Sequence, residues 1–263
     1  MDLNDAKFQS VPAELAAVLS RFERVALAFS GGVDSAYLLH AALAQGLDVK
    51  AYYVASVFQP AFEREDARRL VAELGAEMEV LELDVLSSPA VSSNSPERCY
   101  WCKRAIMGAV QEAARADGRT VLFDGSNASD DVADRPGMRA LVELEVHSPL
   151  REAGLTKARI RELSRRAGLF TWDKPAYACL ATRIPTGREI TPQLLERVER
   201  AESAMFAMGL RDFRVRVMGE AARIEVTADE LPLLLERREE IVARLGEDFA
   251  AVLLDLRFRE GSG

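Results

Sequence analysis

The sequence predicts an α/β protein with a Rossmann-like parallel sheet and a smaller C-terminal α+β domain. Three observations support this fold class. Short apolar segments alternate with helix-length segments over the first 170 residues, a glycine-rich loop follows the first apolar segment, and the order of elements changes after residue 190. We therefore expect a first domain at residues 1–170, a connector at 171–190 and a small domain at 191–263.

The first domain opens with an amphipathic segment, residues 11–22. The run from Val25 to Phe29 is short, apolar and stopped by glycines, as is typical of a buried strand. Expected strands cover residues 25–29, 49–55, 78–85 and 120–124, and expected helices cover residues 36–45, 63–74, 97–116 and 156–167. Helices of this length between strands predict right-handed βαβ units and a parallel sheet covered on both faces.

The connector contains prolines and a glycine and shows little periodicity, which indicates an ordered but irregular segment. Thr191 as N-cap and Pro192 in the first turn then predict a helix that reaches Met208. The small domain continues with strands at 213–217 and 223–226, a helix at 228–245 and a strand at 252–258.

Composition and charge argue against several classes of protein. The chain has 263 residues, 49% of them hydrophobic, and a net charge of −8, which argues against a large nucleic-acid footprint. No segment approaches the roughly 18 uninterrupted apolar residues of a membrane span, and the N-terminus lacks the basic-then-apolar pattern of a signal peptide. We therefore expect a cytoplasmic protein that binds neither nucleic acid nor membrane.

The loop at residues 30–35 reads Ser-Gly-Gly-Val-Asp-Ser and lies between the first strand and its helix. Its glycines allow backbone N–H groups to surround an anion, and the helix N-terminus adds partial positive charge. It has neither the Gly-Lys-Ser/Thr of a Walker A loop nor a Gly-x-Gly-x-x-Gly pattern. The loop is therefore interpreted as a different kind of phosphate cradle, the alternative being a glycine-rich turn with a helix cap.

A second polar segment, from Asp124 to Asp131, follows another expected strand. Open α/β sheets bind ligands at the carboxyl ends of their strands, so this segment is a candidate to face the same nucleotide. The same residue types also form ordinary surface turns, and that interpretation stays open.

Three cysteines in a reducing compartment argue against a disulfide framework and favour metal binding or thiol chemistry. Cys99 and Cys102 are spaced i, i+3 at the start of a helix, so both thiols share one face. The helix terminus and the neighbouring Arg98 and Lys103 favour thiolates. Cys179 lies in the connector, where core packing does not require it.

Three thiolates can hold a [4Fe-4S] cluster that leaves one iron open. A zinc site needs a fourth ligand, and the histidines available, His40 and His147, are better explained as structural residues. A redox-active Cys-x-x-C pair and two inert helix cysteines remain as alternatives.

The loop at 30–35 resembles the pyrophosphate loop (PP-loop) of the ATP-pyrophosphatase superfamily, whose members split ATP into AMP and pyrophosphate. The resemblance implies that Asp34 helps to place Mg²⁺ and that Asp131 and Arg135 contribute to the nucleotide site. The residues that the resemblance assigns to the β,γ-phosphates are Ser30, Gly31, Gly32 and Ser35.

With Asp-Gly-Ser-Asn at 124–127, Lys-Pro at 174–175 leading to Cys179 and Arg-Ile-Pro at 183–185, the whole chain resembles the LarE family. Members are ATP-dependent sulfur transferases that convert pyridinium-3,5-biscarboxylic acid mononucleotide to its bisthiocarboxylic form, for the nickel-pincer cofactor of lactate racemase. One version of the family sacrifices the sulfur of a single cysteine, at the position of Cys179. The other binds a [4Fe-4S] cluster with three cysteines, and the additional Cys99 and Cys102 make this chain similar to that version.

In the small domain, the resemblance implies a substrate-phosphate site and contacts between subunits of a homo-oligomer. The residues it points to are Glu202, Arg214, Arg216 and Arg257, with Arg259 as the alternative to Arg257. Guanidinium groups suit phosphate because they bind it in a bidentate manner, and an arginine-rich solvated face remains the alternative. Two rival functions are a tRNA thiolase with a PP-loop and a three-cysteine cluster, and an ATP-binding sensor without catalysis.

Overall fold

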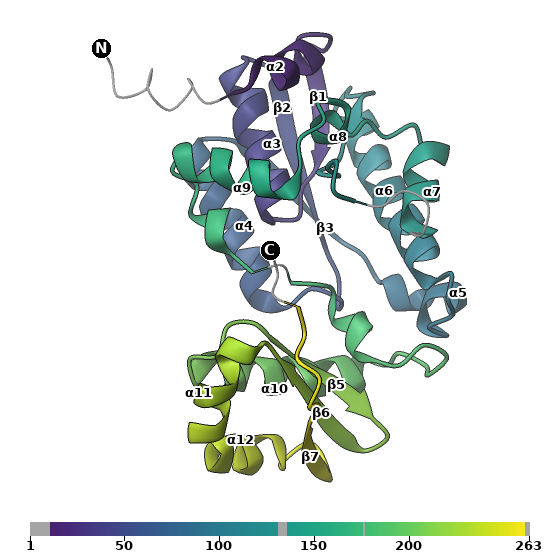
Figure 1. Cartoon of the computed structure of the whole chain (residues 1–263). Coiled ribbons are helices and arrows are strands. Elements are labelled where there is room, and N and C mark those ends of the chain that lie inside the picture. The colour runs from purple at the N-terminus through teal and green to yellow at the C-terminus, as the bar shows by residue number, and fades with distance from the viewer. Residues whose placement is uncertain (1–10, 131–135, 176, 261–263) are drawn as a thin grey trace. The chain divides into compact units, whose positions relative to one another are not determined.

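A computed structural model of the chain describes residues 11–130, 136–175 and 177–260 (Figure 1). Asp131 and Arg135, both predicted to lie at the nucleotide site, fall outside these residues. The chain forms two compact units, one of residues 1–56, 61–85 and 99–174 and the other of residues 57–60, 86–98 and 175–263. The segments 57–60 and 86–98, which the sequence assigned to the first domain, thus join the small unit. In the described part of the chain, no helix is both long and apolar enough to cross a membrane.

The first unit is built on a parallel sheet of four strands in the order β3-β2-β1-β4. The strands are β1 (Arg24–Ala28), β2 (Asp48–Ala55), β3 (Glu77–Glu82) and β4 (Leu122–Phe123). Strand β1 pairs with β2 on one side and β4 on the other, so the order of the strands reverses at β1. The predicted α/β fold class is confirmed.

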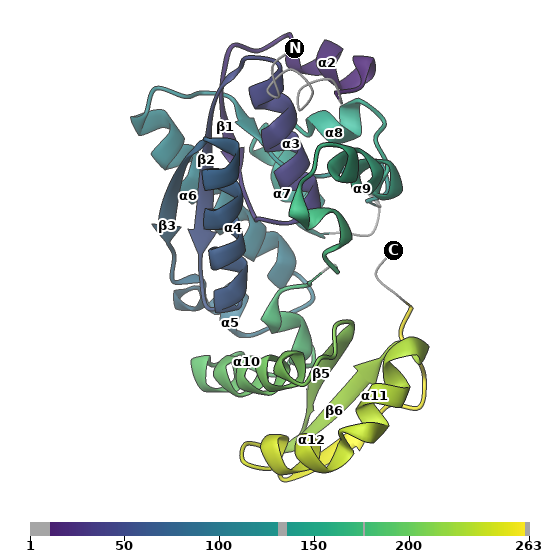
Figure 2. The same ribbon diagram turned by 90° about the vertical axis from the view of Figure 1, so that its left-hand side faces the viewer.

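Helices cover both faces of this sheet (Figures 1 and 2). One face packs against α2 (Ala13–Leu19), α3 (Val33–Ala44), α4 (Ala61–Leu74) and α9 (Lys157–Arg166). The other packs against α6 (Arg98–Ala116) and α7 (Pro136–Glu143). Alternate β1 residues divide between the two cores, because Leu27 belongs to the first and Ala26 to the second.

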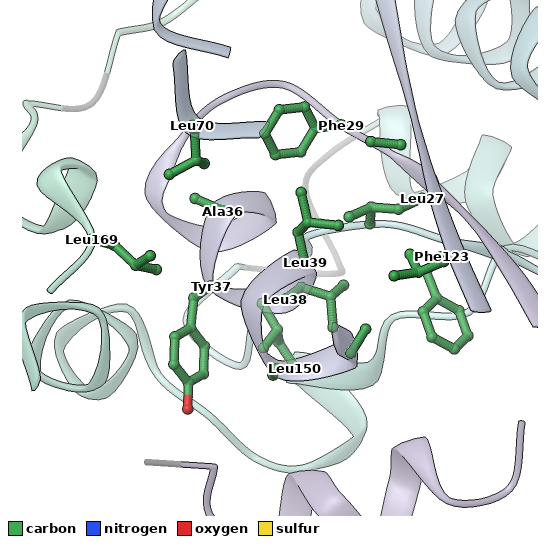
Figure 3. Packing of buried hydrophobic residues seen from close by; sticks show 14 of the residues in the cluster. Leu27, Phe29, Ala36, Tyr37, Leu38, Leu39, Leu70, Phe123, Leu150 and Leu169 are labelled. Atoms are coloured by element: carbon green, nitrogen blue, oxygen red, sulfur yellow. The ribbon is translucent and has the colours of Figure 1, made fainter. Parts of the chain in front are cut away.

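Helix α3 is the centre of the larger core. Nine of its residues are buried, and Figure 3 shows Tyr37, Leu38 and Leu39 surrounded by residues of the sheet and of the neighbouring helices. A helix that is apolar on nearly every side is held in place by packing all around it. The loop before α3 is therefore joined to a helix that packing holds rigidly in place.

The second unit contains an antiparallel β5-β6 pair, with β7 added parallel to β6. Its elements are α5 (Pro89–Ser92), η3 (Leu180–Arg183), α10 (Pro192–Ala207), β5 (Phe213–Met218), β6 (Ala221–Val226), η4 (Ala228–Glu230), α11 (Leu231–Glu236), α12 (Arg238–Leu245) and β7 (Ala251–Leu254). One sheet face carries the buried Phe213, Val215 and Val217. The opposite face carries Arg214 and Arg216, as expected for alternation along a strand.

Several predicted boundaries were wrong. The single helix expected at 228–245 is interrupted at Arg237, within a run of five exposed charged residues, 236–240, that has no apolar side chain to hold it against the core. The last strand ends at Leu254 instead of residue 258, because the Asp255 carboxylate accepts the Arg257 N–H and turns the chain. Strand β3 ends at Glu82, and a short 3₁₀ helix, η1 (Val85–Ser87), follows it.

Candidate active site

Two loops lie at the carboxyl ends of β1 and β4, the adjacent strands where the order of the sheet reverses. Ligands of open α/β sheets bind at such a position. The two loops touch, since a Cβ atom added to Gly125 would lie 3.0 Å from the Ser35 backbone nitrogen and 3.4 Å from the Asp34 Cβ. The prediction that the 124–131 segment faces the same region as the glycine loop is thus supported up to Asp130, where the described residues stop.

The glycine loop is held together by its two serines. Their hydroxyl groups are 3.1 Å apart, the Ser35 hydroxyl donates to the Gly32 carbonyl at 3.2 Å, and the Ser30 N–H donates to the Ser35 hydroxyl at 3.3 Å. Helix α3 starts at Val33 and receives no side-chain hydrogen bond from its N-cap, Gly32. The first-turn N–H groups are therefore available to an anion.

Two independent observations explain why residue 31 is a glycine. Its φ of +73° lies in the left-handed region, and an added Cβ would lie 3.1 Å from the Ala67 Cβ on α4. We expect Gly31→Ala to lower the free energy of unfolding by about 1–3 kcal/mol, measured by urea denaturation.

Gly46→Ala is the matched control for this change, because Gly46 has a φ of +75° and nothing within 4 Å of the added Cβ. The difference between the two variants in the free energy of unfolding measures the cost of the contact with α4. Equal losses of stability in both variants would mean that α4 does not constrain the loop.

Asp34 lies in the first turn of α3 with its two carboxylate oxygens in different environments. Oδ2 accepts a hydrogen bond from Lys157 Nζ at 2.6 Å. Oδ1 is buried and has no hydrogen-bond partner among the residues that the structure describes. Burial raises the pKa of Asp34, and the Lys157 ammonium opposes that rise. A buried, unpaired carboxylate oxygen beside a phosphate cradle is a suitable ligand for a hard divalent cation.

The second loop is ordered by Asp124, which is buried. Its carboxylate accepts hydrogen bonds from the Ser126 hydroxyl at 2.6 Å and the Ser148 hydroxyl at 2.7 Å. Lys103 Nζ lies 3.9 Å from the same carboxylate. Because Lys103 follows Cys102 on α6, the helix turn that carries the cysteine pair is linked to the loop beside the phosphate cradle.

The three cysteines form no disulfide among the described residues, and they are divided between the two units. Cys99, which is exposed, and Cys102, which is partly buried, occupy the first turns of α6 in the first unit. Cys179 is partly buried in the second unit, and the guanidinium of the buried Arg98 donates to its Sγ at 3.7 Å. Among the described residues, no group of three or more His, Cys, Asp and Glu side chains is arranged to hold a metal ion.

The predicted phosphate-binding residues of the second unit fall into three environments. Arg214 is buried near Asp212, and burial lowers its pKa. Arg216 is partly exposed and donates to Glu225 and to the Thr182 carbonyl, both at 2.6 Å. Arg259 pairs with Asp212, whereas Arg257 is exposed, so the geometry favours Arg259 over Arg257 as a member of the arginine cluster.

Sequence reasoning missed Lys157 and the contact between Arg98 and Cys179. Lys157 had a detectable signal, because a lysine at the first position of a helix opposes the helix dipole and is unfavourable unless an anion is near. The Arg98 contact joins residues 81 positions apart and leaves no local signal.

A parallel sheet with this serine-glycine loop at its reversal point defines a PP-loop protein. The chain is 33% identical to the pyridinium-3,5-bisthiocarboxylic acid mononucleotide synthase of Lactiplantibacillus plantarum, over 95% of this chain and 92% of that protein. The chain belongs to the LarE family. The predicted family and the prediction of an enzyme are confirmed.

The chain is also similar to other proteins. An uncharacterized Synechocystis protein, slr1717, is 36% identical over 80% of this chain and 78% of its own length. A tRNA-specific 2-thiouridylase, MnmA, of Bradyrhizobium is 30% identical over 63% of this chain and 51% of its own length. No protein-family model matches the chain.

Proposed function

We propose that this enzyme is an ATP-dependent sulfur transferase. It adenylates the carboxylates of pyridinium-3,5-biscarboxylic acid mononucleotide and converts them to thiocarboxylates, for the nickel-pincer nucleotide cofactor of lactate racemase. The observation that carries the proposal is the PP-loop with its unpaired Asp34 oxygen, in a chain similar over 95% of its length to a synthase of the bisthiocarboxylic product.

In this proposal, the loop binds ATP through its phosphates. Backbone N–H groups around Gly31 and Gly32 and the hydroxyls of Ser30 and Ser35 hold the β,γ-phosphates. Asp34 Oδ1 is the ligand for Mg²⁺, which supplies charge neutralisation on the pyrophosphate. Asp131 and Arg135 remain predicted members of the same site.

Adenylation converts a poor leaving group into a good one. A substrate carboxylate oxygen attacks the α-phosphorus, the bond to the β-phosphate oxygen breaks, and pyrophosphate leaves. A sulfur nucleophile then attacks the acyl carbon and AMP departs with the former carboxylate oxygen. Lys157, fixed beside Asp34 at 2.6 Å, places a positive charge where the pyrophosphate gains negative charge.

Cys99, Cys102 and Cys179 are the proposed source of the sulfur, as ligands of a [4Fe-4S] cluster. Thiolates are the ligands that iron–sulfur clusters take, and a cluster held by these three cysteines would supply an open iron for the transferable sulfide. The alternative is a single-use transfer of the Cys179 sulfur.

The arginines of the second unit are proposed to bind the substrate phosphate. Arg214 and Arg216 share one face of β5, and Arg259 lies close to Arg214 through their common partner, Asp212. Guanidinium groups with their stems already packed lose little freedom when they bind phosphate. A homo-oligomer and a cytoplasmic location remain predictions.

The proposal is tested with anaerobically prepared protein, ATP, Mg²⁺, a sulfide source and the biscarboxylic mononucleotide. We expect pyrophosphate release that depends on the mononucleotide, together with a thiocarboxylate product detected by mass spectrometry. The similarity to MnmA makes tRNA the comparison substrate. Pyrophosphate release that responds to tRNA and not to the mononucleotide would identify a tRNA thiolase instead, and release with neither would favour a non-catalytic ATP-binding protein.

A further inference from the structure

The segment that carries Cys179 is fastened on both sides of the cysteine to one buried carboxylate. This is Glu202 of α10, whose side chain is 2% exposed. Arg183 Nε donates to Oε1 at 2.8 Å and Arg183 Nη2 donates to Oε2 at 3.1 Å, in the fork geometry of a bidentate pair. The Tyr177 hydroxyl also donates to Oε2. Tyr177 precedes the cysteine by two residues and Arg183 follows it by four.

The third attachment of Glu202 is to strand β5. Its Oε1 accepts the Val215 N–H at 2.8 Å, and Val215 lies between Arg214 and Arg216. Arg216 adds a separate link, because its Nη1 donates to the Thr182 carbonyl at 2.6 Å. One carboxylate thus joins the cysteine segment to the strand that carries the candidate phosphate-binding arginines.

Arg183 also donates hydrogen bonds to residues within the cysteine segment. Its Nη1 donates to the Ala178 carbonyl at 3.1 Å and to the Thr182 hydroxyl at 2.7 Å, and that hydroxyl donates to the Cys179 carbonyl at 2.8 Å. The Arg183 side chain is only 1% exposed. The backbone on both sides of the thiol is therefore fixed by a single guanidinium.

The contacts of Glu202 are those of a structural anchor. Its two oxygens accept four hydrogen bonds from the protein, and a carboxylate repels a phosphate group. Burial alone would lower the pKa of Arg183, but the hydrogen bonds and charge of Glu202 raise it, so the pair stays ionised. Removing either partner leaves an uncompensated buried charge.

We propose that Tyr177, Arg183 and Glu202 form a clasp that positions the Cys179 thiol for sulfur transfer. The role of the thiol rests on the proposed function, but the clasp is tested on the thiol alone. The clasp holds the backbone around Cys179 so that Sγ stays beside Arg98, in fixed register with Arg214 and Arg216. All three are positioning residues and act through Cys179.

The test is the rate at which iodoacetamide alkylates each cysteine in the reduced, metal-free full-length protein, followed by peptide mass spectrometry. In Glu202→Gln and Arg183→Lys, we expect Cys179 alkylation to become about tenfold faster. Each change weakens the buried Arg183–Glu202 pair, so the segment around Cys179 opens to solvent more often. Tyr177→Phe, which removes one hydroxyl, is expected to act in the same direction with a smaller effect. The rates at Cys99 and Cys102 should not change.

The matched control is Arg200→Met, which removes an exposed arginine and its pair with Asp248 from the same helix. It should leave the Cys179 rate at the wild-type value. Because the buried-pair variants can lose their fold, Tyr177→Phe decides the outcome. The clasp is overturned if Tyr177→Phe leaves the ratio of Cys179 to Cys99 alkylation unchanged, or if it accelerates all three cysteines equally.

Activity gives a separate readout. With the clasp weakened, we expect thiocarboxylate formation to fall several-fold, and Arg183→Lys to retain more activity than Arg183→Met because it keeps the charge. If wild-type protein forms no thiocarboxylate, the proposed function fails while the alkylation result still decides the clasp.

Discussion

Replacing Asp34 with asparagine is expected to lower mononucleotide-dependent pyrophosphate release by at least about a hundredfold, the size of effect seen when a preorganised charge at a reacting group is removed. The asparagine side chain would keep the shape of the aspartate but lose the charge that attracts Mg²⁺ and that orients Lys157 at 2.6 Å. The measurement is the initial rate of pyrophosphate release at saturating ATP and Mg²⁺. If the initial rate of the variant stays within a few-fold of the wild-type rate, Asp34 is not a ligand of the metal.

The same substitution should not destabilise the ligand-free protein at neutral pH. Burial raises the pKa of Asp34 above its ordinary value, so the folded state binds this proton more tightly than the unfolded state does. The stabilisation from this group is therefore present at low pH and is lost as the pH rises through the folded-state pKa. We expect Asp34→Asn to be at least as stable as wild type at pH 7.5 in urea denaturation.

Asp48→Asn is the matched control because the pKa of Asp48 is shifted in the direction opposite to that of Asp34. The Arg119 hydrogen bond lowers the pKa of Asp48, so this carboxylate stabilises the fold above its ordinary pKa and that contribution is lost as the pH falls. Asp48→Asn should lose stability at pH 7.5, and the loss should shrink towards pH 3. If both variants change stability in the same direction, the buried-charge argument for Asp34 is wrong.

The parts of the fold that sequence could predict are those fixed by local pattern. The short apolar strand before Ser30 and the glycines after it identify β1 and its loop, because a buried parallel strand requires near-continuous apolar residues. The start of α3 was placed three residues too late. Helical geometry begins at Val33, which puts Asp34 and Ser35 in the first turn and brings the helix N–H groups closer to the cradle.

The parts that sequence could not predict depend on contacts between distant residues. Lys157 reaches Asp34 across 123 positions, and Arg183 meets Glu202 only because η3 and α10 pack together. Glu202 illustrates the difference, since its family resemblance placed it near a phosphate but did not reveal its four protein donors. Motifs identify residue types at a site, whereas tertiary packing decides which atom faces the ligand.

Replacing Cys99 with alanine is expected to stop multiple turnover, leaving fewer than one thiocarboxylate per chain, while mononucleotide-dependent pyrophosphate release continues. Cys99 and Cys102 lie at i, i+3 on the first turns of α6, and a three-thiolate ligand set fails when any one donor is lost. The adenylation residues lie on the loop after β1, so they keep their positions. The measurements are product per chain, pyrophosphate per chain, and iron and labile sulfide in the oxygen-free protein.

The comparison with Cys179→Ala separates the two sources of sulfur. With a reusable cluster, all three alanine variants lose iron and multiple turnover, and wild-type Cys179 keeps its mass after the reaction. With single-use transfer, only Cys179→Ala is inactive, wild-type protein makes at most one product per chain, and Cys179 becomes dehydroalanine with loss of its sulfur. Wild-type protein without iron or labile sulfide, together with full multiple-turnover activity in Cys99→Ala, would exclude the cluster. The exposed position of Cys99 gives it no packing role that explains a loss of activity, so a defect in this variant reports on sulfur chemistry.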